Sequence, residues 1–492
     1  MPRTELDVFW PRWLFLRGLG LIFLSAFYSL AFQIHGLIGE RGILPADYYL
    51  HQASTSLGPL ERVWFLPTLL WVNASDAALS AIVVAGIVAS ILLVFNIRPR
   101  LAVAVCTLLF LSCISGLQDF SSYQSDGMLL EAGFISLFFA PLGTRPGLGL
   151  DDPPSRFSLF MLRWEWFRIY FESGLVKILS GDERWRNFTA MDDYYQNGPL
   201  PSWIGWYVQQ LPHWYHVGTV ILTFVVELFL VWAVFLPRRF RIGCFIVVTA
   251  LQIGIIATAN YAFLNYIVLL LGVLLLDDKA LAWIGLKVQT RPEPRIRSIV
   301  YRRAESVILG IALYVTVAAF VMGQSGSILA LPYRLLSPFR VANAYGLFAV
   351  MTPARYEIEF QGSNDGASWV AYPFRYKPQD VKEPPGLYAP YQPRFDWNLW
   401  FASLAPWQQN PWVVLTEQRL VDGSPSVLSL FRDDPFHGKP PAIVRTVLWQ
   451  YWFTDISTKD KTGAWWRREE IGPFSPSVRR DPQGNPVFTA PQ

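Results

Sequence analysis

Residues 163–185, "RWEWFRIYFESGLVKILSGDERW", place charged side chains inside a run that is otherwise apolar and aromatic. In a helix at 100° per residue, Glu165, Arg168 and Glu172 fall on one side. Ionised groups are costly in hydrocarbon, so we expect this stripe to face the interior of a helix bundle, where its members can pair. Two interpretations stay open: a network that fixes helix packing, or a polar cavity that binds a ligand or a client segment.

Lys177 lies about one helical turn before the polar end of the same run. A lysine at this depth can extend its ammonium group to the membrane surface while its stem stays in the apolar region. If it is buried instead, it can serve as a base or a nucleophile. Lys177 and Glu172 are therefore the candidate catalytic residues.

The composition predicts a polytopic α-helical membrane protein. The chain has 492 residues and is 52% hydrophobic and 16% charged, whereas soluble proteins carry about 25% charged residues. Apolar runs long enough to cross roughly 30 Å of hydrocarbon recur through the first two thirds. We predict about nine spans, at residues 13–34, 76–95, 101–118, 128–141, 157–179, 217–236, 242–259, 262–276 and 304–323.

Basic residues predict the orientation of these spans. With the N-terminus in the cytoplasm, 16 Lys and Arg residues fall in inner loops and 4 in short outer loops, as the positive-inside rule requires. The loops 35–75, 119–127 and 180–216, and the chain after about residue 324, are then periplasmic or extracellular, or lumenal in a eukaryotic cell.

The C-terminal region changes character. "RYEIEFQGSNDGASWVAYPF" (355–374) predicts a β-hairpin that turns at Asn364–Gly366, and "AIVRTVLWQYWFTDI" (442–456) predicts a strand. "FDWNLWFASL" (395–404) predicts a short helix with Asp396 as its N-cap. We therefore expect an extracytoplasmic α+β domain over residues 340–475, after a transmembrane domain over 1–330 and before a tail over 476–492.

Further polar residues lie in or near the predicted spans. Asp126 and Glu131 come from "QSDGMLLEAGF", and Glu227 lies mid-span, where it must be neutral or paired with a cation such as Arg168 or Arg17. Together they predict an outward-facing polar cavity. Its candidate residues are Asp126, Glu131, Glu165, Arg168, Glu227 and Asn260.

The sequence contains no Gly-rich phosphate loop, no Gly-x-Ser-x-Gly motif and no paired Cys/His set. We therefore expect no metal, no cofactor and no nucleic-acid partner. The expected partners are the lipid bilayer and an exported client protein.

Several long motifs carry a family resemblance. "RWLFLRGLGLIFLSAFYSLAFQIHGLIGERGILPA" (12–46), "SDGMLLEAGFISLFFAPLGTRP" (125–146) and "NAYGLFAVMTPARYEIEFQGSNDGASW" (343–369) resemble the lipase maturation factor family, and the match runs in order over about residues 10–460. The shorter chain with few cysteines is similar to a bacterial-type member.

The resemblance implies a membrane-anchored maturation or folding factor for exported proteins. Animal members help secreted lipases to fold and assemble, so lipases are the implied clients. The family commonly has a His-Tyr-Glu-Thr-Gln-Pro-like run where this chain has "YYQNGP" (194–199). The candidate client-contact residues are Trp185, Tyr194, Tyr195, Trp203, Trp397 and Trp400.

A second resemblance supports an enzymatic alternative. "SGLVKILSGDERW" (173–185) is similar to a segment of the horizontally transferred transmembrane domain superfamily, which includes the vitamin K-dependent γ-carboxylase. That enzyme uses a membrane lysine as a base. The alternative is therefore a membrane enzyme that acts on a peptide or lipid-like substrate through Lys177.

Overall fold

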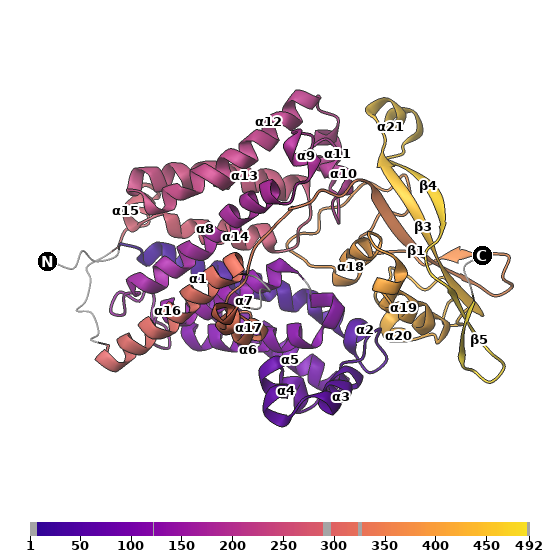
Figure 1. The fold of residues 1–492 in the computed structure, drawn as a ribbon, viewed down its shortest axis with the longest axis horizontal. Coiled ribbons are helices and arrows are strands. Elements are labelled where there is room, and N and C mark those ends of the chain that lie inside the picture. Colours follow the sequence, from indigo (N-terminus) through magenta and orange to yellow (C-terminus); the bar gives the residue numbers. More distant parts are fainter. Residues whose placement is uncertain (1–6, 122, 289–296, 323–326, 490–492) are drawn as a thin grey trace.

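The computed structural model describes residues 7–121, 123–288, 297–322 and 327–489. The described chain forms a helical bundle, up to residue 322, and a domain built on a β-sheet, from residue 341, which we call the sheet domain (Figure 1). Three of the 16 basic residues predicted to face the cytoplasm, Arg3, Arg291 and Arg295, lie outside the described residues.

Helices occupy all nine predicted spans. They are α1 (Phe9–Ala31), α5 (Asp76–Val94), α6 (Pro99–Gly116), α7 (Gln124–Phe139), α8 (Arg156–Leu179), α12 (His213–Phe224) continued by η3 (Val225–Phe229) and η4 (Leu230–Phe235), α13 (Arg238–Thr258), α14 (Leu264–Gly272) continued by η5 (Val273–Leu275), and α16 (Ile299–Met322). Six of these segments are long and apolar enough to cross a membrane. The helices α7 and α14–η5 are shorter and α8 is richly charged, so the number nine stays a prediction.

Aromatic side chains fill the bundle where its first helices meet. Phe23 and Phe27 of α1 pack edge-to-face on Phe110 of α6, with ring centroids 6.0 and 5.7 Å apart. A Cβ on Gly86 of α5 would lie 2.4 Å from the Phe27 ring, so only glycine permits this approach of α1 and α5.

Helix α1 runs from one end of the bundle to the sheet domain. The backbone N–H of Phe9 donates to Asp278, the first residue of α15 (Asp278–Leu281), which η6 (Ala282–Ile284) follows. At the other end, Gln33 just after α1 donates to the carbonyl of Gln392. Short elements gather at the sheet-domain end: α2 (Ile34–Ile38), α3 (Ala46–Ser56), α4 (Pro59–Phe65), η1 (Leu69–Trp71), η2 (Gln118–Ser121), α9 (Glu183–Arg186), α10 (Tyr194–Asn197) and α11 (Trp203–Gln209). The connection to the sheet domain contains η7 (Ile328–Ala330), α17 (Leu331–Leu336) and η8 (Ser337–Phe339).

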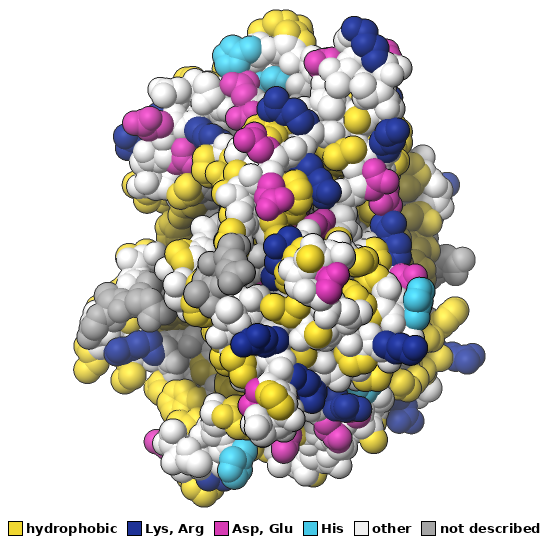
Figure 2. Space-filling view, turned by 90° about the vertical axis from the view of Figure 1, so that its right-hand side faces the viewer, with side chains coloured by type: hydrophobic (Ala, Val, Ile, Leu, Met, Phe, Trp, Pro, Cys, Tyr) yellow, Lys and Arg dark blue, Asp and Glu magenta, His cyan; other side chains and the backbone are white. Residues whose placement is uncertain are grey.

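The sheet domain is an antiparallel sheet covered by helices on its bundle side (Figure 1). Its strands are β1 (Arg355–Ser363), β2 (Val370–Ala371), β3 (Ile443–Phe453), β4 (Trp466–Pro473), β5 (Ser477–Arg480) and β6 (Pro486–Thr489), in the order β2-β1-β3-β5-β6 with β4 also on β3. Its helices are α18 (Arg394–Ala402), η9 (Trp407–Gln409), α19 (Trp412–Val421), α20 (Pro425–Leu428) and α21 (Ile456–Thr462). Figure 2 shows basic and acidic side chains interspersed over the sheet-domain face of the molecule, as on a surface in water.

Two sequence predictions for this domain need correction. Residues 477–489 are no tail: β5 and β6 pair as a hairpin, β5 also pairs with β3, and Val478 is fully buried on the covered face of the sheet. Asp396 is not the N-cap of α18, which begins at Arg394; its carboxylate accepts from the backbone N–H groups of Tyr376 and Lys377 instead. The predicted hairpin does form, although β2 has two residues only.

Candidate functional site

The charged stripe of α8 is buried inside the bundle. Arg168 forms an ion pair with Glu131 of α7, and its Nη1 lies 3.8 Å from Oε1 of Glu172 one turn along α8. Glu165 is also fully buried, near Arg168 and Glu131. The stripe therefore faces the bundle interior, as the helical spacing predicts.

This cluster holds the segment that enters the sheet domain. Glu131 Oε2 accepts from the Tyr345 hydroxyl at 2.8 Å and from the backbone and side-chain N–H groups of Asn343, both at 3.1 Å. Glu172 Oε2 accepts from the Tyr345 backbone N–H at 2.7 Å, and Arg168 donates to the Asn343 carbonyl at 2.6 Å. Buried charges of the bundle thus fix the position of residues 343–345.

Lys177 pairs with Glu227, in a different place. Its Nζ donates to Oε2 and Oε1 of Glu227 at 2.8 and 3.0 Å and lies 5.2 Å from the Trp185 ring. Lys177 is 2% exposed, so it does not extend to the surface. Glu227 is thus paired with a cation, as predicted, but the cation is Lys177 and neither Arg168 nor Arg17, because Glu227 approaches α8 at Gly174, where a Cβ would lie 2.8 Å from the Glu227 Cβ.

Asp126 and Asn260 connect the bundle to the sheet domain. Arg394 donates to both Asp126 oxygens, at 2.8 and 2.9 Å, and also to the Phe120 carbonyl. Asn260 donates to the Gly386 carbonyl at 2.9 Å, and its side-chain oxygen accepts from the backbone of Tyr388 at 2.7 Å. The predicted polar residues therefore lie in separate ion-pair and hydrogen-bond clusters, and not around one cavity.

The sheet domain holds residues 194–199, the segment whose sequence differs from the run that is common in the family the chain resembles. Arg355 is buried and donates to the carbonyls of Gln196, Gly198 and Pro199. Burial lowers the pKa of Arg355, and its ion pair with Glu357 opposes this shift. Asn197 donates to the Thr352 carbonyl at 2.9 Å. These contacts fix one wall of a cleft.

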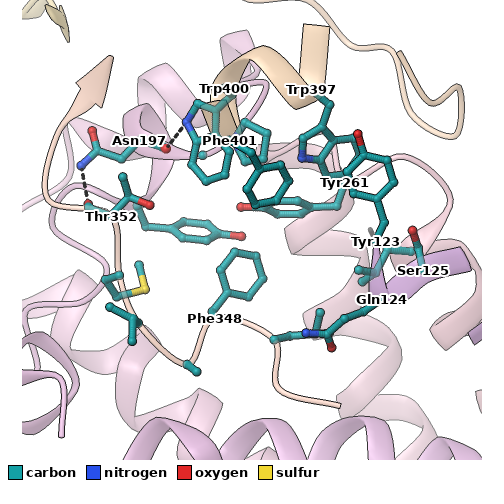
Figure 3. A pocket seen from close by; sticks show the side chains of 18 of the residues that line it. Tyr123, Gln124, Ser125, Asn197, Tyr261, Phe348, Thr352, Trp397, Trp400 and Phe401 are labelled. Atoms are coloured by element: carbon teal, nitrogen blue, oxygen red, sulfur yellow. Dashed lines mark hydrogen bonds between the residues drawn. The ribbon is translucent and has the colours of Figure 1, made fainter. Parts of the chain in front are cut away.

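Figure 3 shows this cleft, which lies between the bundle and the sheet domain and has a volume of about 430 Å³. Aromatic rings from both parts line it: Tyr123, Tyr194, Tyr261, Phe348, Trp397, Trp400 and Phe401. Most of these rings are buried, whereas Phe401 is 46% and Val350 67% exposed at the rim. A cleft of this composition suits an apolar or aromatic group.

Three residues that line the cleft have a buried polar atom without a hydrogen-bond partner among the described residues: Asn197 Oδ1, the Tyr261 hydroxyl and Trp397 Nε1. Trp397 is 5% exposed, and its indole Nε1 has no hydrogen-bond partner among the residues that the structure describes. The indole of Trp400 beside it donates to the Asn197 carbonyl at 3.1 Å. A buried N–H without an acceptor is costly.

The candidate client-contact residues divide between two places. Tyr194, Trp397 and Trp400 line the cleft, while Trp185, Tyr194 and Tyr195 line a second cavity beside Lys177. Trp203 is 43% exposed on α11 and lines neither. Sequence reasoning missed Tyr261, Phe348 and Arg394 as site residues, although Phe348 and Arg394 lie in stretches that carry the family resemblance.

Comparison with known proteins identifies the family. The lipase maturation factor transmembrane domain matches residues 10–283 and the lipase maturation factor C-terminal domain matches residues 341–476. Lipase maturation factor 1 of Mus musculus is 31% identical over 97% of this chain and 88% of its own length. Lipase maturation factor 2 of Gallus gallus is 30% identical over 95% of this chain and 81% of its own length. No solved structure matches the chain. The chain is therefore an integral membrane protein that belongs to the lipase maturation factor family.

Proposed function

We propose that the protein is a membrane-anchored maturation factor that assists the folding or assembly of exported proteins. The names of its relatives indicate lipases as the class of client. The observation that carries the proposal is the aromatic cleft between the bundle and the sheet domain. Its rigid walls would hold an apolar or aromatic segment of a client that has not yet reached its final fold, and so keep that segment from aggregating.

The proposal places the N-terminus in the cytoplasm and the sheet domain outside it. The distribution of basic residues supports this orientation. Buried ion pairs fix the cleft from both sides, through Arg394 with Asp126 and through Arg168 with Glu131. A site built on rigid elements binds without a large loss of conformational freedom.

The test is the specific activity of an exported lipase in a host that lacks this gene and carries it back as wild type or variant. Phe401→Ala removes an exposed ring at the rim of the cleft, and Phe488→Ala removes an equally exposed ring on β6 outside it (46% and 54% exposed). At equal membrane levels, we expect Phe401→Ala to lower the active fraction of lipase several-fold and raise its aggregated fraction. Equal effects of both variants would contradict a role for the cleft.

The enzymatic alternative is tested in the same assay. A Lys177→Met, Glu227→Gln double variant removes the amine without leaving a buried carboxylate unpaired. A maturation factor without chemistry at this lysine should keep most of its activity. Loss of all activity at a normal membrane level would instead favour a reaction at Lys177.

A further inference from the structure

A second cavity lies among α8, α12 and α13, with a volume of about 530 Å³. This volume falls within the roughly 300–1,000 Å³ of typical small-molecule sites. Its walls are mainly apolar, and its polar lining includes the Lys177–Glu227 pair, Tyr170 and Gln252. The cleft of Figure 3 lies on the other side of Tyr194, Phe348 and Met351, which line both spaces.

The cavity opens toward the outer surface of the bundle. Leu222 of α12 and Ile246 and Val247 of α13 line the cavity and are also 42%, 61% and 40% exposed. Helix α13 packs on η4, α14 and α11, whereas it contacts α12 little. Three residues of α13 are buried among 21. Because these exposed side chains are apolar, the opening faces the hydrocarbon of the bilayer.

The inner end of the cavity is polar but balanced in charge. Glu227 lies on η3, a π-helical turn within an apolar span, and such turns occur frequently at functional sites. Its carboxylate is neutralised by Lys177 at 2.8 Å. The Tyr170 oxygen accepts from Gln252 at 2.7 Å, so the tyrosine proton, which has no acceptor among the described residues, can be donated into the cavity. This end is polar but carries no net charge, so it does not attract a free carboxylate.

We propose that this cavity binds one acyl chain of a bilayer phospholipid, which enters between α12 and α13 while its ester group and headgroup stay at the membrane surface. The opening selects this occupant, because phospholipid chains are the molecules that surround exposed apolar helices in a membrane. The proposal does not depend on the maturation function, since it concerns a lipid and not a client protein.

The chain offers a matched pair of variants for the test. Gly254 and Gly243 are both exposed glycines on α13, and a Cβ on either meets nothing within 4 Å. They lie 11 residues apart, which brings them to nearly the same side of the helix. Only Gly254 lines the cavity. Gly254→Phe should therefore fill the opening, while Gly243→Phe makes the same change elsewhere on the lipid-facing surface.

The full-length protein is reconstituted in phosphatidylcholine vesicles that contain a trace of phosphatidylcholine with a photoactivatable group on one acyl chain. After illumination, labelled residues are mapped by mass spectrometry. We expect labelling concentrated on residues 219–227 and 246–255, lowered at least fivefold by Gly254→Phe and unchanged by Gly243→Phe. Labelling spread evenly over the exposed apolar helices, or equal in both variants, would overturn the proposal.

A competition experiment shows whether the bound acyl chain belongs to a phospholipid or to a free fatty acid. Added oleate, which carries a free carboxylate, should leave the labelling of these residues unchanged. If oleate at low molar ratio removes the label, the site prefers a free fatty acid and the assignment to a phospholipid is wrong.

Discussion

Replacing Asp126 with Asn is expected to weaken the attachment of the sheet domain to the bundle, because it leaves the Arg394 guanidinium buried without its counter-ion. Arg394 donates to the two Asp126 oxygens at 2.8 and 2.9 Å and to the Phe120 carbonyl at 2.8 Å. Both side chains of the ion pair are at most 2% exposed. Water therefore cannot replace the lost carboxylate.

Removal of one partner from a buried ion pair costs about 3–5 kcal/mol. With an unfolding entropy of about 2.1 cal/mol/K per residue, this cost lowers the Tm by about 3–5 °C if the whole chain unfolds together, and by about 11–18 °C if residues 355–489 unfold alone. The size of the shift therefore also reports which part of the molecule the pair stabilises.

The assay is thermal unfolding of the detergent-solubilised protein, followed by tryptophan fluorescence. An Asp126→Asn, Arg394→Met double variant removes both charges and should recover at least half of the loss. As a control, Asp192→Asn removes the partner of the exposed His213, and should change the Tm by less than about 1 °C. An unchanged Tm for Asp126→Asn alone would refute the reasoning.

Two further predictions concern packing and protonation. Gly174→Ala should lower the Tm by several degrees, because the new Cβ would lie 2.8 Å from the Glu227 Cβ, whereas Gly310→Ala, whose Cβ meets nothing within 4 Å, should leave it unchanged or raise it. Burial raises the pKa of Glu417, which accepts from Ser475, to about 8 from its ordinary 4.5; the folded state thus holds a proton that the unfolded chain releases. The contribution of this proton to the free energy of unfolding, up to about 5 kcal/mol, is complete below pH 4.5 and is lost as the pH rises through 8. Glu417→Gln should therefore make the Tm depend less on pH. A wild-type Tm that does not fall between pH 5 and 9 would contradict the assignment.

The sequence predicted the helices well, since an apolar run of membrane-spanning length has few other ways to satisfy its backbone. Its prediction of 76–95, for example, differs from α5 by one residue at the C-terminus. It also predicted that Glu165, Arg168 and Glu172 share one side of a helix, because that depends on helical period alone.

The partners of these charges could not be predicted, because they come from contacts between distant segments. Glu227 reaches Lys177 through a π-helical turn and the close approach at Gly174, and neither follows from local sequence pattern. Arg394 stands in a motif that looks like the start of an exposed helix, and only the folded chain brings it to Asp126. The predicted single cavity failed for the same reason.

The bonds between α8 and the connecting segment have a consequence for synthesis in the cell. Glu172 receives its hydrogen bond from the backbone of Tyr345, 173 residues later in the chain. At about 5–20 residues per second, the ribosome needs roughly 9–35 s to make that stretch. During this interval the membrane holds a charged helix whose last partners do not yet exist. A nascent chain that stops before residue 343 therefore leaves the buried carboxylates of Glu131 and Glu172 without the donors that Asn343 and Tyr345 supply.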